Sequence, residues 1–493
     1  MIRKIVFLFS ATLALTCLAA RLQVNAQSTS LTADTLTADT LAVGTLAVGL
    51  KSPAKIVITD GGNLIVAEAG TGQNDGRISL IDRCGNRRTL LDGLPSGRAG
   101  EGASSGPSGL ALRGRTLFVA IGAGDAVVPG PRPGTEIANP NGPASPIFSS
   151  VLMAEFNTEV DFVAVGGALS ANDHAMLKSG AAFTVPGETA TLKLLADFPD
   201  FVSDPFTIAR PSNPFALALE GNHLYVADAS FNLVSKVNVE TGAAETLARF
   251  APLANPLPFG PPRVDAVPDG LCVFNDQLLV TFLTGFPFPS GKAEVRSLAL
   301  STGSATTFIG GLTTAIDVLP AKTRYGGDQF FVLEISSNLT AGAPGRLLRY
   351  DAPTAAPVVI AGGLIGPVGL ARDARSGDLF ITENFTGRVM QILGTEFDVC
   401  LQDDETGEAL RFNSLTGDYR FIGCRAGLTL AGRGKISRAG CALQLSSPRV
   451  LATLDRCLIS PLNRGSAIIK RYSFGSAIFI HDSDTTNNTC TGR

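Results

Sequence analysis

The feature that most constrains the fold is a short apolar motif that returns about every 50 residues. In each copy, consecutive aliphatic, aromatic or small residues form a run typical of a buried strand. The copies lie at residues 64–68, 117–121, 224–228, 278–282, 330–334 and 379–383. Four of the five intervals between successive copies are close to 50 residues, and the second interval is about twice as long. A unit of this length indicates a propeller blade of four short strands, whose apolar face is covered only by the next blade.

The units also carry a signal for the first strand of a blade. Small residues next to Pro or Gly open these segments and allow close approach around a central axis. The openings lie at residues 106–111, 213–218, 268–273 and 366–371. The sequence therefore predicts an all-β fold, with a six-bladed β-propeller at residues 51–395 and a small disulfide-containing β domain at residues 396–493.

The long second interval has two interpretations. It begins with a loop rich in Pro and Gly at residues 122–146, and strand-like segments follow at 151–156 and 160–165. We interpret the interval as a long loop over one mouth of the propeller together with enlarged outer strands of the second blade. The alternative is a seventh, degenerate blade at residues 151–200.

Composition agrees with a folded all-β protein and excludes some partners. Of the 493 residues, 45% are hydrophobic and 17% are charged, and 54 Gly with 29 Pro leave little room for long helices. The chain carries 40 basic and 43 acidic residues, a formal net charge of −3. This balance offers no basic surface for nucleic acid.

The N-terminus has the features of a secretion signal. Arg3 and Lys4 are basic, residues 5–20 are apolar, and residues 24–26 supply small side chains for a peptidase. We expect cleavage before Gln27, which makes residues 1–26 a signal peptide and the mature protein extracellular, periplasmic or bound to the cell envelope. The alternatives are a membrane anchor, for which the apolar run falls short of about 20 residues, and lipid attachment at Cys17. No second apolar run follows, so no transmembrane segment is expected after cleavage.

Residues 27–50 are predicted to form a low-complexity linker. Within them a five-residue repeat places Leu31, Leu36, Leu41 and Leu46 in register. Four short copies cannot bury a core alone, so a linker is favoured. The alternative is a strand or stalk that packs on a neighbour.

Cysteine usage marks the C-terminal domain. Beyond residue 396 lie five cysteines: Cys400, Cys424, Cys441, Cys457 and Cys490. In an exported chain this density indicates disulfides, and proximity in sequence suggests the pairs Cys400–Cys424 and Cys441–Cys457. No two cysteines have C-x-x-C spacing and the chain has three His, so a zinc site is disfavoured.

Several segments resemble the ScyD/ScyE family of secreted proteins. The resemblance is carried by Leu-Thr-Gly-Phe-Pro-Phe-Pro-Ser-Gly at 283–291, Ser-Asn-Pro-Phe at 212–215, Ile-Asp-Val at 316–318 and Ala-Gly-Gly-Leu at 361–364. It covers residues 50–395 and implies an NHL-type propeller, but it implies no particular reaction. The C-terminal segment resembles a small β module found in various exported bacterial proteins.

One candidate metal site follows from a further resemblance. Pro268-Asp269-Gly270 is similar to the segment that supplies a metal-binding aspartate in gluconolactonase-type propellers. Asn213 would be a second ligand, and calcium or another divalent metal the cofactor. Lys51 stands near the place where a glutamate is expected, which weakens the site because a lysine repels a cation. The alternative is that Asp269 only forms a turn with Gly270.

Other polar residues have a structural interpretation. Glu68, Asp228, Glu334 and Glu383 each end a second strand, where a carboxylate is expected to accept backbone N–H bonds from its own blade. The alternative is that these four line a mouth of the propeller. A G-x-S-x-G pattern at residues 102–106 lacks the strand and helix of a nucleophile elbow, and His174, His223 and His481 are expected on the surface or in turns. Residues 482–487 have oxygen-bearing side chains but lack the Gly and distal Glu of an EF-hand.

These features favour a binding role over an enzymatic one. Loops 122–150 and 283–291 would present a surface to a protein, a glycan or a small molecule. Phe286 and Phe288 are the predicted contact residues, because prolines separate and stiffen this aromatic pair; the alternative is that they plug the adjacent blade. The rival function is a metal-dependent hydrolase or lactonase that acts at an axial pocket around Asp269.

Overall fold

The computed structural model describes residues 43–392, apart from 84, 101, 132–134, 204–209, 323–326 and 375–376, and then separate strands between 398 and 479. The predicted signal peptide lies outside these residues. The described part is almost entirely β, with one α-helix, α2 (Ala171–Lys178), and two short 3₁₀ helices, η1 (Val160–Phe162) and η2 (Leu339–Ala341). None of its helices is long and apolar enough to cross a membrane.

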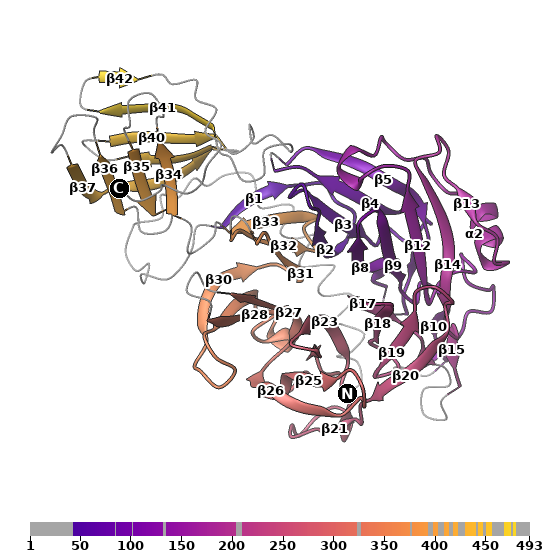
Figure 1. The fold of residues 1–493 in the computed structure, drawn as a ribbon. Coiled ribbons are helices and arrows are strands. Elements are labelled where there is room, and N and C mark those ends of the chain that lie inside the picture. The colour runs from indigo at the N-terminus through magenta and orange to yellow at the C-terminus, as the bar shows by residue number, and fades with distance from the viewer. Residues whose placement is uncertain are drawn as a thin grey trace, which may run out of the picture.

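Six antiparallel sheets surround a central axis and form a six-bladed propeller, as predicted (Figure 1). Blades 1, 3 and 4 each contain four strands in sequence order. Their strands are β2 (Pro53–Ile58), β3 (Leu64–Glu68), β4 (Gly76–Ile81) and β5 (Arg87–Leu94); β17 (Pro214–Glu220), β18 (His223–Asp228), β19 (Leu233–Asn238) and β20 (Ala244–Arg249); and β23 (Pro268–Phe274), β24 (Gln277–Phe282), β25 (Ala293–Ala299) and β26 (Ala305–Leu312).

Blade 5 has the same order, whereas blades 2 and 6 depart from it. Blade 5 contains β27 (Ala315–Lys322), β28 (Asp328–Glu334), β29 (Gly345–Tyr350) and β30 (Val358–Leu364). Blade 2 contains β8 (Pro107–Arg113), β9 (Thr116–Ile121), β12 (Ser150–Phe156), β14 (Ala190–Asp197) and β13 (Phe183–Thr184), and blade 6 contains β31 (Pro367–Arg372), β32 (Leu379–Glu383), β33 (Arg388–Ile392) and β1 (Val43–Ala47).

The enlarged blade 2 confirms the outer strands of our first interpretation of the long interval, although the strand-like segment at 160–165 contains η1 and no strand. Residues 151–200 supply the outer strands of one five-stranded sheet and form no seventh blade. The segment between β12 and β14 extends to blade 1, where the Asp161 carboxylate accepts hydrogen bonds from the Thr59 hydroxyl at 2.6 Å and the Gly61 N–H at 2.9 Å. The insertion therefore braces two neighbouring blades.

The ring is closed by residues from both ends of the propeller sequence. β1 pairs antiparallel with β33, with Val43 opposite Ile392 and Thr45 opposite Met390. β1 thus becomes the outermost strand of blade 6 (Figure 1). This differs from the linker expected for residues 27–50, of which residues 43–47 form a strand that packs on a neighbour.

Close packing near the axis requires glycine in three first strands. A Cβ on Gly109 would lie 2.9 Å from the Ala216 Cα of the next blade, and a Cβ on Gly270 would lie 2.9 Å from the Asp317 Cα. A Cβ on Gly369 of blade 6 would lie 3.0 Å from the Lys55 Cα of blade 1. The small residues in the strand openings therefore serve the close approach that the sequence predicts.

Four two-stranded hairpins accompany the blades. They pair β6 (Gly97–Arg98) with β7 (Ser104–Ser105), β10 (Val127–Pro129) with β11 (Glu136–Ala138), β15 (Phe201–Val202) with β16 (Arg210–Pro211), and β21 (Leu253–Ala254) with β22 (Arg263–Val264).

The C-terminal residues form two further antiparallel sheets. Their strands are β34 (Asp398–Gln402), β35 (Ala409–Asn413), β36 (Asp418–Ile422) and β37 (Thr429–Arg433) in one sheet, and β38 (Lys435–Ala439), β39 (Ala442–Ser446), β40 (Val450–Asp455), β41 (Ile468–Phe474) and β42 (Ala477–Phe479) in the other. Cys424, Cys441 and Cys457 lie outside the described residues, as does the side chain of Cys400. The two disulfide pairs therefore stay predictions.

Candidate functional site

A cavity of about 350 Å³ lies at the mouth where the first strands begin. Two kinds of residue build it: those that open first strands, such as Ala54 and Ser108, and those that follow second strands, such as Ala69 and Asn384. The hairpin of β6 and β7 adds Ser104 and Ser105. Because every blade brings the same two positions to the axis, the cavity wall contains residues distant in sequence.

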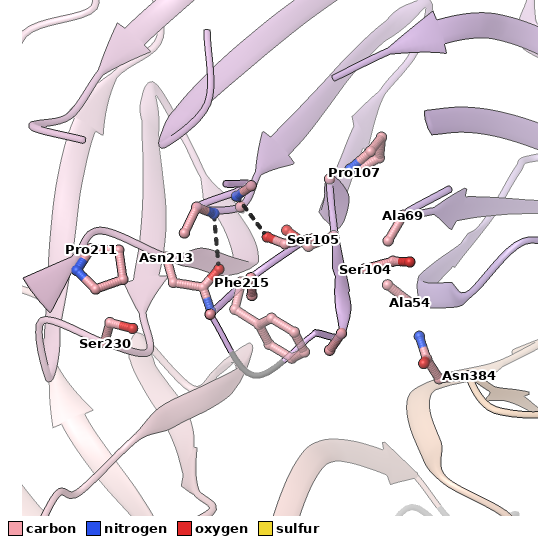
Figure 2. Close-up of a pocket in the computed structure, with 18 of the residues that line it drawn as sticks. Ala54, Ala69, Ser104, Ser105, Pro107, Pro211, Asn213, Phe215, Ser230 and Asn384 are labelled. Atoms are coloured by element: carbon pink, nitrogen blue, oxygen red, sulfur yellow. Dashed lines mark hydrogen bonds between the residues drawn. The ribbon is translucent and has the colours of Figure 1, made fainter. Parts of the chain in front are cut away.

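Polar side chains from blade 3 and the β7 hairpin hold a loop of blade 2 in place. The Asn213 side-chain oxygen accepts a hydrogen bond from the Ala123 N–H at 3.3 Å, and the Ser105 hydroxyl accepts one from the Gly124 N–H at 3.0 Å (Figure 2). Within the described residues, the Asn213 amide nitrogen and the Ser104 hydroxyl make no hydrogen bond. These two groups are therefore available to a ligand.

The opposite side of the cavity carries Asn384 from blade 6 (Figure 2). Its amide nitrogen donates to the Pro53 carbonyl at 3.2 Å, so its side-chain oxygen remains available as an acceptor. The ring of Phe215 also lines the cavity. The wall thus combines hydroxyl and amide groups with an aromatic face, and among the described lining residues Glu136 is the one with a charged side chain.

A buried lysine on the axis lies close to the Phe215 ring. The Lys55 ammonium is 5.4 Å from the ring centroid and donates to the carbonyls of Ile316 at 2.9 Å and Val368 at 3.0 Å. It also forms an ion pair with Asp317 at 3.1 Å. Its three donors therefore have three oxygen partners, which is the condition for a charge to be buried at tolerable cost.

Asp269 is buried beside this group and does not line the cavity. Its side chain is 3% exposed, and its Oδ2 atom has no hydrogen-bond partner. Burial raises the pKa of Asp269 to about 8; the Lys55 charge opposes this rise, and the Asp317 charge adds to it. The carboxyl group is consequently neutral at pH 7.

The two predicted metal ligands, Asn213 and Asp269, lie in different environments. Asn213 lines the open cavity, whereas Asp269 lies in the interior. The described residues contain no group of three His, Cys, Asp or Glu side chains that could hold a metal ion. The Lys55 ammonium near Asp269 repels a divalent cation, so the arrangement gives no support to the lactonase-type site.

The structural interpretation of the four acidic residues that end second strands is confirmed. Each accepts a backbone N–H bond from the segment that leads into its own blade, and each is at most 4% exposed. The pairs are Glu68 with Lys51 N at 2.6 Å, Asp228 with Asn213 N at 3.0 Å, Glu334 with Thr313 N at 2.6 Å, and Glu383 with Ile365 N at 2.8 Å. These carboxylates fix the turns from which the cavity wall is built.

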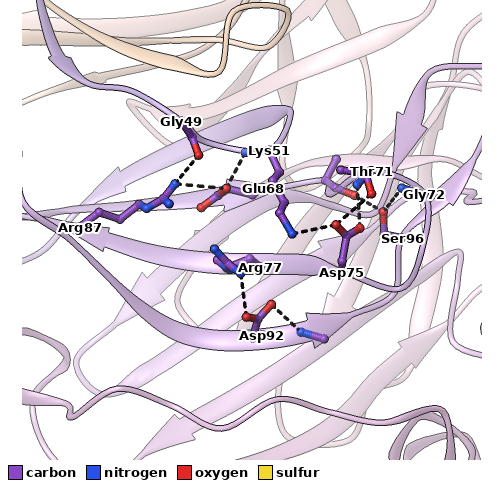
Figure 3. Close-up of polar contacts among 12 residues, drawn as sticks. Gly49, Lys51, Glu68, Thr71, Gly72, Asp75, Arg77, Arg87, Asp92 and Ser96 are labelled. Atoms are coloured by element: carbon purple, nitrogen blue, oxygen red, sulfur yellow. Dashed lines mark hydrogen bonds and ion pairs between the residues drawn. The ribbon is translucent and has the colours of Figure 1, made fainter.

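Blade 1 shows how such a turn is reinforced (Figure 3). Arg87 lies 3.7 Å from Glu68, and the Lys51 ammonium lies 2.9 Å from Asp75. Burial alone would raise the pKa of Asp75, but the Thr71 N–H and the Lys51 ammonium outweigh it and lower the pKa to about 2. Lys51 is thus engaged in an ion pair rather than directed at the axis.

Phe286 and Phe288 belong to a different surface from the cavity. Their ring centroids are 6.1 Å apart, and Phe286 lies 6.4 Å from Phe259, in edge-to-face arrangements. Both side chains are half-buried, and Phe259 is exposed. The pair therefore forms part of an aromatic cluster on the loops of blade 4, which leaves its predicted role in binding open to test.

One expectation about the histidines is wrong. His174 is fully buried in α2, where it forms hydrogen bonds with the Ser145 hydroxyl at 3.0 Å and the Gly93 carbonyl at 2.9 Å. His223 lies half-buried at the start of β18, and His481 lies outside the described residues.

Sequence reasoning missed Phe215 and Asn384 as cavity residues. The signal was present in the repeat: Phe215 follows the proline that opens β17, and Asn384 follows the acidic residue that ends β32. Aligning those two positions across the six units would have identified the wall.

No family model and no curated protein matches the chain. Among solved structures, a gluconolactonase from Xanthomonas campestris is 11% identical to this chain with a TM-score of 0.42. The match covers 75% of this chain and 95% of the gluconolactonase chain. A putative oxidoreductase (glucose dehydrogenase) from Thermus thermophilus has 14% identity and a TM-score of 0.40, covering 72% and 100%. An aldose sugar dehydrogenase from Streptomyces coelicolor, in its PQQ-bound form, has 14% identity and a TM-score of 0.40, covering 71% and 98%. The assignment of six blades rests on the strand order of this chain itself.

Proposed function

We propose that this protein is an exported binding protein of the ScyD/ScyE kind, and that the mouth of its propeller binds a small, uncharged molecule that carries hydroxyl groups. The observation that supports this most directly is the set of unpaired donors and acceptors on the cavity wall. The Ser104 hydroxyl and the Asn213 amide nitrogen can donate, and the Asn384 oxygen can accept. Donors and acceptors in a cavity that also contains the Phe215 ring suit the hydroxyl groups and the C–H face of a pyranose.

Charge supports the same ligand class. Lys55 lies near the Phe215 ring, but its ammonium is already bonded to two carbonyls and to Asp317, so it attracts no anion. The polar side chains of the wall named above, Ser104, Asn213 and Asn384, are uncharged. Uncharged hydroxyl and amide groups suit a neutral sugar or polyol.

The test is calorimetric titration of the mature protein with methyl glycosides of glucose, galactose, mannose and xylose, and with inositol. Asn213→Asp keeps the oxygen that holds Ala123 and removes the N–H donor, so it should weaken binding roughly tenfold. Asn222→Asp, in the exposed hairpin turn of blade 3, is the matched control and should leave affinity unchanged. Absence of binding by every compound in the panel would overturn the proposal.

A metal-dependent lactonase acting at Asp269 is the rival proposal. Its test is the calcium and zinc content of the wild-type protein and of Asp269→Ala, combined with hydrolysis of gluconolactone. Stoichiometric metal that is lost on substitution, together with hydrolysis, would replace the binding proposal. Equal and low metal content in both proteins would remove the rival.

A further inference from the structure

One position of the repeat is occupied very differently in blade 6. It is the second residue after the end of each second strand, at the rim of the mouth. In blades 1 to 5 this residue is small or carries a hydroxyl group: Gly70, Ala123, Ser230, Thr284 and Ser336. In blade 6 it is Phe385, whose side chain is 49% exposed and lines the cavity.

The Phe385 ring packs against the turn that leads into blade 6. It lies directly against Gly366, since a Cβ on that glycine would come within 2.4 Å of the ring. The turn that carries it is fixed by Glu383, which accepts hydrogen bonds from the Ile365 N–H at 2.8 Å and the Thr386 hydroxyl at 2.7 Å. The ring therefore presents an apolar face to the cavity and has little freedom to lose when a ligand covers it.

The order of blades around the axis gives the cavity two unlike sides. Blades 5 and 6 are neighbours and contribute Ile335, Val368 and Phe385. Blades 2 and 3, across the axis, contribute Asn213 and Ser230, and the β7 hairpin adds Ser104. The side formed by blades 5 and 6 is thus mainly apolar and ends in an exposed ring, with Asn384 as its polar group. The other side carries the unpaired hydroxyl and amide groups together with Phe215.

We infer that the mouth recognises glycosides with an aromatic aglycone, with the aglycone against Phe385 and the sugar hydroxyls toward Asn213. This rests on the proposed function and specifies its ligand. A free sugar would leave the exposed phenyl ring of Phe385 in water, whereas an aryl group would cover it. The sugar alone therefore leaves the Phe385 ring uncovered.

The experiment compares methyl and phenyl glycosides of the same four sugars by calorimetry. The wild-type protein should bind the phenyl compound about tenfold more tightly, in keeping with one aromatic contact. In Phe385→Ala the preference for the phenyl compound should be lost, so that the two glycosides bind equally. Phe385→Tyr should restore the preference, and Phe162→Ala, which removes a 58% exposed ring from the insertion of blade 2, should leave it intact.

The outcomes separate the two proposals. Equal binding of methyl and phenyl glycosides by the wild-type protein, or a preference that survives Phe385→Ala, would overturn the aryl glycoside inference and leave sugar binding standing. Failure of every glycoside to bind would overturn both.

Discussion

Replacing Asp269 by asparagine should stabilise the protein, and more so as the pH rises. In the folded protein burial raises the pKa of Asp269 to about 8, against an ordinary value of 3.8. Between these values the unfolded chain carries an ionised aspartate while the folded chain retains the proton. Raising the pH therefore favours unfolding, and the stability present below about pH 4 is lost progressively up to about pH 8.

The size of the effect follows from the pKa difference. Each pH unit in this window changes the free energy of unfolding by about 1.4 kcal/mol for one group. From pH 5 to pH 8 the wild-type protein should thus lose about 4 kcal/mol relative to Asp269→Asn, which has the same shape and no proton to release.

The assay is denaturant unfolding of both proteins at pH 5, 6, 7 and 8. The stability difference should grow steadily with pH in favour of the variant. Asp276→Asn, in the exposed turn between β23 and β24, is the control and should leave the pH dependence of the wild type unchanged. A variant that is no more stable than the wild type at pH 8 would refute the buried, neutral state of Asp269.

Two further predictions concern the frame of the propeller. Burial lowers the pKa of His174, although the Gly93 carbonyl opposes this. The unfolded chain therefore takes up the proton first, and the stability of the wild type should fall as the pH drops below about 6.5. The melting temperature of His174→Gln should fall less than that of the wild type between pH 7 and pH 5, and an equal fall in both proteins would contradict this. A mature chain that begins at Val48 lacks β1 and leaves the edge of β33 unpaired, so it should melt at a lower temperature and scatter more light. A chain that begins at Leu41 keeps β1 and serves as the control; equal melting of the two chains would show that β1 does not close the ring.

Much of the propeller could be predicted because its signals are local. Each blade repeats an apolar run such as residues 64–68 or 379–383, and a strand that is buried on both faces shows this in its own sequence. The acidic residues at the ends of second strands were interpretable for the same reason, since Glu68 bonds to Lys51 only 17 positions away. Even the enlargement of blade 2 is visible as an interval of double length.

The cavity could not be predicted in the same way, because its residues come together only when the ring closes. Asn213 and Asn384 line one cavity from different blades, and no local pattern relates them. The prediction for Asp269 failed to anticipate that Lys55 would lie beside it, since these residues belong to blades 4 and 1.

The sequence by itself thus determined the all-β class, the number of blades and the turns within each blade, since these depend on neighbours within one repeat. The tertiary structure alone decided that β1 completes blade 6, that Lys55 donates to the Ile316 carbonyl 261 positions away, and that Phe385 lines the same cavity as Asn213. The physical reason is that a propeller brings equivalent positions of every blade to one axis. The character of that axis is set by the combination of residues from several blades, and no single repeat contains it.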